Sequence, residues 1–349
     1  MGRTQRVAGA VLSASLALTV ATGLAPTAMA APAACTWQQT ILPLPSGAPT
    51  GEVWASDNNG GYAGTVSFGA DSANGEPAVL WKNGKITNLG LLAGHQKYVS
   101  VTGVNQAGTV VGSAPKNTGF GEPTAFRSRN GKLAALPELP KAIGSTAQAV
   151  NERGDIVGGV LTEDQIWQPV IWPADKPGTV VRLTGLPTGG NSIVEGIDKD
   201  GTLLVSYDHP TRSRVGYLWK DGTAHELAMP EDAYDVVLRG ISNGRVIGQV
   251  SYGKGGDGPL LWDRDGKPSV PPRAADLQGI NRDGQLVGRT DDPSRHEFGV
   301  WKAGKLDSTI SYTADHGLEL HVSSDDGSIA GRSWKFPGGF DQPTVWRCG

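Results

Sequence analysis

The sequence predicts an all-β fold, a seven-bladed β-propeller of four-stranded blades. Three observations lead to this prediction. A turn glycine followed by a bulky aromatic residue recurs seven times, at the spacing of about 40–50 residues that is typical of propeller repeats. No stretch beyond the N-terminal segment shows the helical period of 3.6 residues. The 50 glycines and 23 prolines suit a chain with many turns.

The seven copies share four features. The turn glycines are Gly60, Gly108, Gly154, Gly201, Gly244, Gly284 and Gly327. The aromatics that follow them are Trp81, Phe126, Trp172, Trp219, Trp262, Trp301 and Trp346. Before the turns stand Asp57, Asn105, Asn151, Asp198, Ser242, Asn281 and Ser324. A second glycine follows four residues after the turn glycine in every copy except the fourth, which has Val205.

Each copy is expected to form four antiparallel strands. The Asp or Asn and the turn glycine favour a hairpin between the first two strands, because Asx side chains bond nearby backbone and Gly adopts positive φ. A β-branched run such as residues 109–112 then forms the second strand. In the first copy residues 77–81 form the third strand, and the turn at residues 82–85 leads into the fourth, residues 86–89.

The first 30 residues have the features of a cleaved signal peptide. Arg3 and Arg6 precede an apolar run at residues 7–20, and Ala28-Met29-Ala30 fits a small-residue cleavage site. The run is shorter than the roughly 20 residues that cross a bilayer, which argues against a membrane anchor. We therefore expect a secreted, extracellular protein with no membrane attachment after cleavage.

Residues 31–349 are expected to form a single propeller domain. The repeats fall near residues 52–95, 97–144, 145–190, 191–233, 234–274 and 275–317, and the last combines residues 318–349 with residues 36–45. This last copy stops soon after Trp346 and lacks a fourth strand, whereas residues 36–45 resemble a fourth strand without a blade. The N-terminal strand should therefore complete the seventh blade and close the ring.

The two cysteines, Cys35 and Cys348, then lie where the other copies have a hairpin turn. In an exported protein this placement predicts a disulfide. The bond would close a loop of more than 300 residues, and loop-entropy models give such a bond about 4–5 kcal/mol of stabilisation. Two unpaired thiols are the alternative.

The composition and motifs exclude several classes of function. The net charge is −3 and no basic block occurs, which argues against nucleic acid as a partner. The six histidines form no i, i+4 pair and no Cys/His cluster, so we expect no metal. No nucleophile elbow or phosphate-binding loop is present, and we expect no cofactor. Residues 198–201 and 325–327 look like parts of calcium loops, but both occupy the repeated turn and lack the downstream Glu. We expect a monomer.

The unit Gly-Ile/Val-Asn-x-x-Gly-x-Val-Val-Gly, followed by an Ala-Phe-x-x-x-x-Gly segment, resembles the bacterial extracellular HAF-repeat family. The similarity is greatest at residues 103–131, 149–172 and 279–301, and it covers nearly all of the chain after residue 30. The chain departs from the family pattern in that the naming tripeptide appears here as Thr124-Ala125-Phe126, which makes it a divergent member. The resemblance implies a secreted β-propeller and carries over no catalytic residue.

One candidate ligand site lies on the first strand of each copy. In six copies a small residue precedes the turn, and the position before it varies among the seven copies: Trp54, Thr102, Gln148, Glu195, Arg239, Gln278 and His321. We call these seven the ring positions. They would surround the channel mouth either as a solvated polar lining or as a ligand site, in which Trp54 stacks on a ring and the others bind polar groups.

A second set of candidates lies on the variable loops between the second and third strands. These are Trp167, His209, Arg295, His296 and Trp334. Variable loops on a rigid frame often carry function, although ordinary solvated loops have the same composition.

We therefore expect a secreted, non-catalytic binding or scaffold propeller whose ligand, a glycan or a peptide, binds the channel-mouth face. The alternative is an extracellular lyase or glycoside-processing enzyme that uses the ring, with Glu195, Arg239 and His321 as weak catalytic candidates and Glu195 and His321 as an acid/base pair. A third hypothesis is a scaffold that binds protein partners around its rim.

Overall fold

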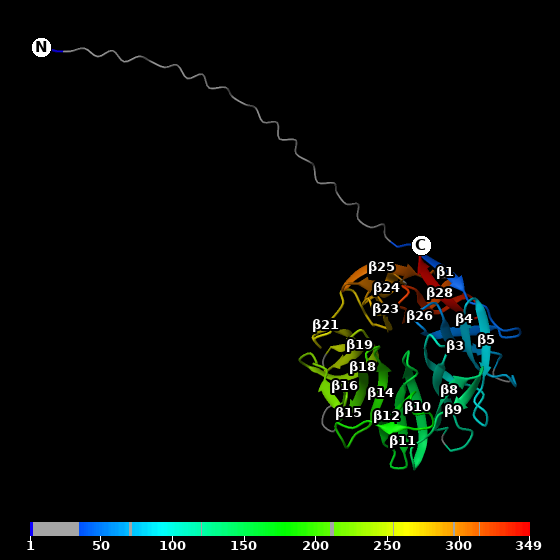
Figure 1. The fold of residues 1–349 in the computed structure, drawn as a ribbon. Helices are drawn as coiled ribbons and strands as arrows, with labels where there is room; N and C mark the ends of the chain where they lie inside the picture. Colours follow the sequence, from blue (N-terminus) through cyan, green and yellow to red (C-terminus); the bar gives the residue numbers. More distant parts are fainter. Residues whose placement is uncertain are drawn as a thin grey trace. The chain divides into compact units, whose positions relative to one another are not determined.

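The computed structural model describes residues 1–2 and 35–349, without residues 70–71, 120, 210–212, 254, 296 and 314. The chain divides into two units, Met1–Ala33 and Ala34–Gly349. The expected signal peptide therefore lies almost entirely outside the described residues, as does His296. The second unit is a seven-bladed β-propeller (Figure 1), which confirms the predicted fold class.

Every blade is a four-stranded antiparallel sheet, with its strands in sequence order in the first six blades and with the N-terminal strand as the outer strand of the seventh. The first blade contains β2 (Thr50–Ser56), β3 (Tyr62–Ser67), β4 (Ala78–Lys82) and β5 (Lys85–Gly90). The second contains β6 (Ser100–Val104), β7 (Val110–Pro115), β8 (Pro123–Arg129) and β9 (Lys132–Ala135). The third contains β10 (Ala142–Val150), β11 (Ile156–Thr162), β12 (Trp167–Trp172) and β13 (Val181–Arg182). The fourth contains β14 (Ser192–Ile197), β15 (Leu203–Asp208), β16 (Arg214–Lys220) and β17 (Thr223–Glu226).

The remaining blades follow the same order. The fifth contains β18 (Ala233–Ser242), β19 (Arg245–Tyr252), β20 (Gly256–Trp262) and β21 (Pro268–Ser269). The sixth contains β22 (Gly279–Ile280), β23 (Leu286–Arg289), the short 3₁₀ helix η1 (Pro293–Arg295), β24 (Glu297–Lys302) and β25 (Lys305–Ser311). The seventh contains β26 (His316–Ser323), β27 (Ile329–Lys335), β28 (Gln342–Cys348) and the N-terminal strand β1 (Trp37–Ile41).

The N-terminal strand closes the ring as predicted. Strand β1 pairs antiparallel with β28, with Trp37 opposite Cys348. Cys35 and Cys348 form a disulfide whose Cα atoms are 5.4 Å apart and whose residues are 313 positions apart in sequence. The bond thus takes the place of the turn that joins the third and fourth strands in the other blades.

Within the described residues, an apolar core lies between each pair of neighbouring blades. The repeated third-strand aromatics contribute to these cores, and Trp262 and Trp301 are fully buried. Most of the indoles also donate a hydrogen bond to a carbonyl in the link that precedes their own blade. These bonds run from Trp81, Trp172, Trp219, Trp262 and Trp301 to the carbonyls of Pro43, Pro137, Thr184, Ala228 and Pro272. The repeat favours Trp because its N–H satisfies a link while its ring fills the core.

The Asx residues before the turns join neighbouring blades as well as forming their own turns. Asn105 is 1% exposed; its side-chain oxygen accepts from the Thr109 amide and its amide group donates to the Asn151 carbonyl of the next blade. Asn281 makes the equivalent bond to Ser324 at 2.9 Å. A buried polar side chain with all its partners holds two backbones in one register.

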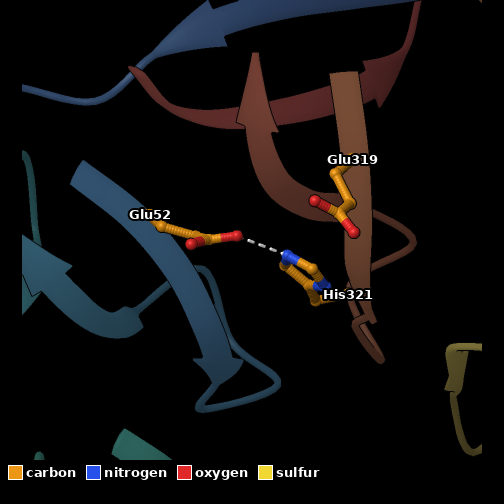
Figure 2. Close-up of side chains that lie close together, drawn as sticks. All are labelled: Glu52, Glu319 and His321. Atoms are coloured by element: carbon orange, nitrogen blue, oxygen red, sulfur yellow. Dashed lines mark hydrogen bonds and ion pairs between the residues drawn. The ribbon is translucent and has the colours of Figure 1, made fainter. Parts of the chain in front are cut away.

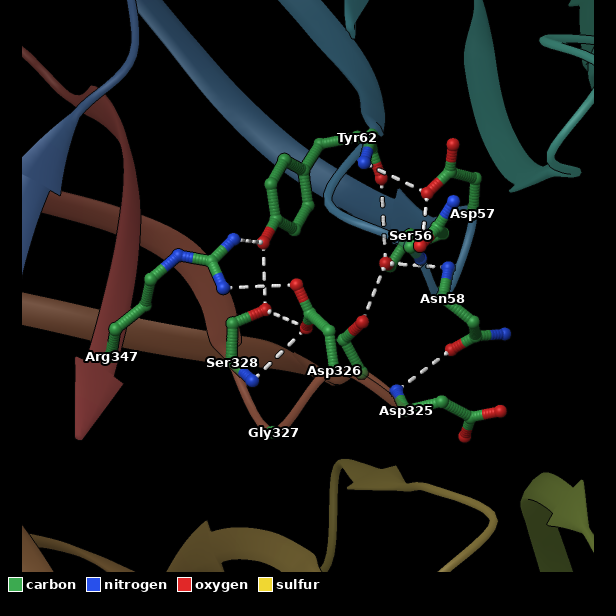
Figure 3. A network of polar contacts seen from close by, with 12 residues as sticks. Ser56, Asp57, Asn58, Tyr62, Asp325, Asp326, Gly327, Ser328 and Arg347 are labelled. Carbon is green, nitrogen blue, oxygen red and sulfur yellow. Dashed lines mark hydrogen bonds and ion pairs between the residues drawn. The ribbon is translucent and has the colours of Figure 1, made fainter. Parts of the chain in front are cut away.

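The junction of the seventh and first blades has a polar network of its own (Figure 3). The Ser56 hydroxyl donates to Ser324, and the Asp325 amide donates to the side chain of Asn58. Farther out, Arg347 on β28 links two groups: it donates to the hydroxyl of Tyr62 on β3 and to the carboxylate of Asp326, each at 2.9 Å. The closing blade is therefore joined to the first by side chains as well as by its core.

Candidate functional site

The ring positions occupy an irregularity that recurs in the first strands. The pairing of the first and second strands shifts by one residue at Trp54, Thr102, Gln148, Glu195, Arg239 and His321. In the sixth blade Gln278 directly precedes β22, and its backbone N–H donates to the backbone carbonyl of Val287. A β-bulge leaves one residue unpaired and turns its side chain out of the regular alternation. In six of the seven blades the ring position is therefore the bulged one.

In the six repeats that have it, the second glycine makes room for this bulge. At these glycines a Cβ atom would overlap or crowd the carbonyl oxygen of the residue two positions before the ring position. The glycine–carbonyl pairs are Gly64 with Glu52, Gly112 with Ser100, Gly158 with Thr146, Gly248 with Val237, Gly288 with Asp276 and Gly331 with Glu319. The fourth blade has the same bulge with Val205, and nothing in the structure explains this exception.

Five ring side chains line a single cavity of about 250 Å³, namely Trp54, Thr102, Arg239, Gln278 and His321. Backbone of the neighbouring small residues, such as Gly103 and Gly240, forms part of the same wall. We call this space the ring cavity. Gln148 and Glu195, the other two ring positions, are not among its lining residues.

The aromatic part of the ring cavity is Trp54 stacked on His321. Their ring centroids are 4.4 Å apart and the planes differ by 22°. Trp54 remains 42% exposed, so the indole still offers contact area. His321 Nε2 lies 2.6 Å from Oε1 of Glu52, with both side chains largely buried (Figure 2). Glu52 thereby fixes the imidazole, and the imidazole supports the indole.

Glu52 also belongs to a charged cluster around Arg332. The Arg332 Nε donates to Glu319 at 3.0 Å and lies 3.2 Å from Glu52, and Nη1 lies 3.1 Å from Asp341. Burial opposes the charge of Arg332, but these carboxylates raise its pKa. Glu52, Glu319 and His321 hold potential ligand atoms within 4.8 Å of one another. Because a guanidinium already neutralises both carboxylates, this geometry does not favour a metal ion.

Glu195 has a different environment from the rest of the ring. Its Oε1 accepts a hydrogen bond of 2.6 Å from the hydroxyl of Ser206 on β15. Burial raises the pKa of this carboxyl, and the opposing effects of Ser206 and Arg214 do not cancel the rise. The expected acid/base pair of Glu195 with His321 is thus not the pairing that the structure displays, since His321 bonds Glu52.

The buried carboxyl of Glu195 leads to a pH-dependent prediction. Because its pKa is higher in the folded than in the unfolded state, its protonated form stabilises the fold, and this contribution is lost as pH rises through the folded pKa. In Glu195→Gln the side chain is neutral at every pH. The free energy of unfolding of this variant, relative to wild type, should therefore increase from about pH 4 to about pH 7. Urea unfolding at both pH values measures the difference, and an unchanged difference would contradict the assignment.

The other polar ring residues differ in how many of their hydrogen-bonding groups already have a partner in the protein. The Thr102 hydroxyl donates to the Ala147 carbonyl of the next blade at 2.8 Å. Gln278 donates to Asp276 at 3.1 Å, and Gln148 is half-buried. Arg239 is exposed and has no ion pair or side-chain hydrogen bond with any described residue. Arg239 is therefore the ring side chain with the most unused bonding capacity.

The ring cavity continues toward the turns between first and second strands. There a wider opening of about 500 Å³ shares Asn58 and Ile241 with it. We call this opening the turn-side mouth. It lies at the opposite end of the blades from the loops between second and third strands, because the strands are antiparallel.

The loop candidates have local partners on separate blades. The Trp167 amide donates to Asn191, and His209 contacts the edge of Tyr207. Arg295, at the end of η1, pairs with Asp292 at 3.0 Å. Trp334 contacts Phe336 edge to face, with Arg332 5.6 Å from its ring centroid. These contacts join each loop candidate to its own blade or to the link that follows that blade.

Comparison with known proteins supports the fold. No protein-family model and no curated protein matches the sequence. An acylaminoacyl peptidase from Pyrococcus horikoshii matches 82% of this chain and 50% of its own, with a TM-score of 0.51 and 13% identity. A structure from a study of two prolyl endopeptidases matches 86% of this chain and 47% of its own, with a TM-score of 0.52 and 12% identity. This chain thus spans about half the length of those two proteins.

A third similar structure is the β-propeller domain of the trilobed protease from Pyrococcus furiosus. It matches 85% of this chain and 95% of its own, with a TM-score of 0.51 and 10% identity. That domain is described as having an open velcro topology, whereas here β1 pairs with β28. At these identities the likeness shows the propeller fold alone.

In the described residues, no helix is long and apolar enough to cross a bilayer.

Sequence reasoning located the ring positions but missed Glu52 and Arg332. Glu52 lies two residues before Trp54, and Glu319 lies two residues before His321. Acidic residues two positions before a ring position in the two adjoining blades were a usable signal. No pattern in the sequence indicates that both carboxylates contact Arg332, because that contact depends on the closure of the ring, which places β27 beside β2.

Proposed function

We propose that this protein is a secreted, non-catalytic binding propeller whose ligand occupies the ring cavity. The observation that carries the proposal is Trp54, an indole that is 42% exposed although it lies at the wall of a cavity. Its position is fixed by His321, which Glu52 holds in turn. A concave site with one rigid aromatic and several polar groups is typical of ligand binding.

Export is supported by two features of the chain. The Cys35–Cys348 disulfide is typical of proteins that mature in oxidising compartments. The first 30 residues have the composition of a signal peptide. The resemblance to the HAF-repeat family, whose members are extracellular, points the same way.

A ligand in the ring cavity should depend on the indole. Trp54→Ala is expected to weaken binding by about 2 kcal/mol or more, roughly 30-fold, because buried aromatic anchors dominate binding energy. The measurement is binding of purified protein to an array of cell-wall polymers, neutral and acidic glycans and peptides, followed by calorimetry on the hits. The thermal midpoint of the variant shows whether the fold is retained.

Phe340→Ala is the matched control for the binding test. Phe340 is 60% exposed and lies between β27 and β28, at the other end of the blades. Binding that is lost in Phe340→Ala and kept in Trp54→Ala would contradict a site in the ring cavity and would favour rim recognition of a protein partner.

The enzyme alternative rests on one observation, the imidazole of His321 held by Glu52 at 2.6 Å. A histidine oriented by a carboxylate can act as a general base. Turnover of a bound polymer that disappears in His321→Gln, with binding intact, would favour a lyase or glycoside-processing enzyme over a binding protein.

A further inference from the structure

The charges around the ring cavity indicate what kind of ligand it accepts. Arg239 brings a guanidinium to the wall of the cavity, and among the described residues no carboxylate pairs with it. A guanidinium presents a rigid fork of donors that matches a carboxylate or phosphate. Unlike Arg332, which contacts three carboxylates, Arg239 is left with its donors available.

The nearby carboxylates are already engaged. Glu52 is bonded to His321 and lies beside Arg332. Glu195, the neighbouring ring position on the fourth blade, bonds Ser206 and does not line the cavity. Asp276 pairs with Arg289 at 2.6 Å. The positive charge of Arg239 is therefore not neutralised from within the ring.

Positive charge continues into the turn-side mouth. Lys199 and Arg264 line it, and neither has a carboxylate partner among the residues that the structure describes. Three acidic residues also line it, and each is bonded within the protein: Asp325 lies 3.8 Å from Arg282, and Asp198 accepts from the backbone amides of Asn243 and Gly244. Asp200 pairs with Lys220, which lowers the pKa of this carboxyl to about 2. Lys199 and the guanidinium nitrogens of Arg264 other than Nε, which donates to the Asn243 carbonyl, therefore remain available to a ligand.

Shape and chemistry favour a sugar ring over a peptide. The volume of about 250 Å³ is just below the roughly 300–1,000 Å³ of sites for drug-sized ligands. Its aromatic surface is the indole of Trp54, and seven of the other lining residues have polar side chains, among them Arg239 and Gln278. A pyranose offers a C–H face for the indole and hydroxyls for Gln278 and Thr102.

We propose that the ligand is an acidic glycan, in which one sugar ring stacks on Trp54, its carboxylate binds Arg239, and neighbouring units extend through the turn-side mouth past Lys199 and Arg264. This inference rests on the proposed function, since it names the ligand class of the same cavity.

The test compares oligogalacturonate, oligoglucuronate and oligomannuronate with their carboxyl-reduced, neutral counterparts, using calorimetry on the full chain. At least one acidic oligomer should bind about 10- to 100-fold more tightly than its neutral partner, the range of one charge-assisted bidentate contact. Arg239→Gln should abolish that difference, and Arg239→Lys should restore only part of it. Binding of the acidic form should also weaken with added salt.

Arg182→Gln is the matched control. Arg182 is an exposed arginine on the outer strand β13, away from the ring cavity, and the variant should bind as wild type does. If neutral and acidic oligomers bind equally, or if Arg239→Gln weakens both alike, the acidic-glycan inference is wrong, while dependence on Trp54 would still support the proposed function. Absence of binding to every oligomer overturns the inference, and absence of any Trp54-dependent ligand on the wider array overturns the proposed function as well.

Discussion

Removing the disulfide, in the variant Cys35→Ser/Cys348→Ser, is expected to lower the free energy of unfolding by about 4–5 kcal/mol. The bond joins residues 313 positions apart, so it restricts nearly the whole unfolded propeller. Loop-entropy models assign the largest stabilisation to such long loops, although strain in the folded state can reduce it. The double substitution avoids leaving a free thiol that could pair between molecules.

The folded state of this variant should keep its ring closed. Strand β1 still pairs with β28 from Trp37 to Ile41, and Trp37 still donates to Ser308 at 3.1 Å. We therefore expect unchanged near-ultraviolet circular dichroism and a lower urea midpoint. Non-reducing peptide mapping of the wild type should show the Cys35–Cys348 link. A loss below about 1 kcal/mol would mean that strand pairing alone closes the ring.

Gly112→Ala should destabilise the propeller by about 3 kcal/mol or more, because its methyl group would meet backbone that cannot move away. Gly112 faces the carbonyl of Ser100 across the bulge at Thr102, and a Cβ would also lie 2.8 Å from the ring of Phe126. The ladder between β6 and β7 must then open, or the bulge must be lost. Chemical denaturation of the purified variant gives the change directly.

Gly240→Ala is the control for Gly112→Ala. Gly240 also lies next to a bulge, but the nearest atom to an added Cβ is 3.7 Å away, on Ile280. This variant should change stability by less than about 1 kcal/mol. Equal effects of the two substitutions would show that the glycines matter for chain entropy rather than for the close approach of the bulge.

The sequence by itself determined the architecture of this protein. Turn chemistry and the spacing of glycines and aromatics are local properties. Seven copies of one unit, the last of which lacks its fourth strand, predict that the N-terminal strand completes the last blade and closes the ring. The same register placed Cys35 opposite the end of the last strand. Local hydrogen bonding and hydrophobic alternation act over a few residues, so a structural repeat can be recognised from the sequence alone.

Only the tertiary structure decided what the variable positions do. Alignment of the copies placed Trp54, Glu195 and His321 in one ring, but the bulge and the next blade determine where each side chain points. Trp54 stacks on His321 because the seventh blade lies next to the first, whereas Glu195 accepts a hydrogen bond from Ser206 within its own blade. Side-chain contacts between blades join residues more than 250 positions apart, as Glu52 and His321 show. No local pattern encodes such contacts, because they depend on how the whole ring packs.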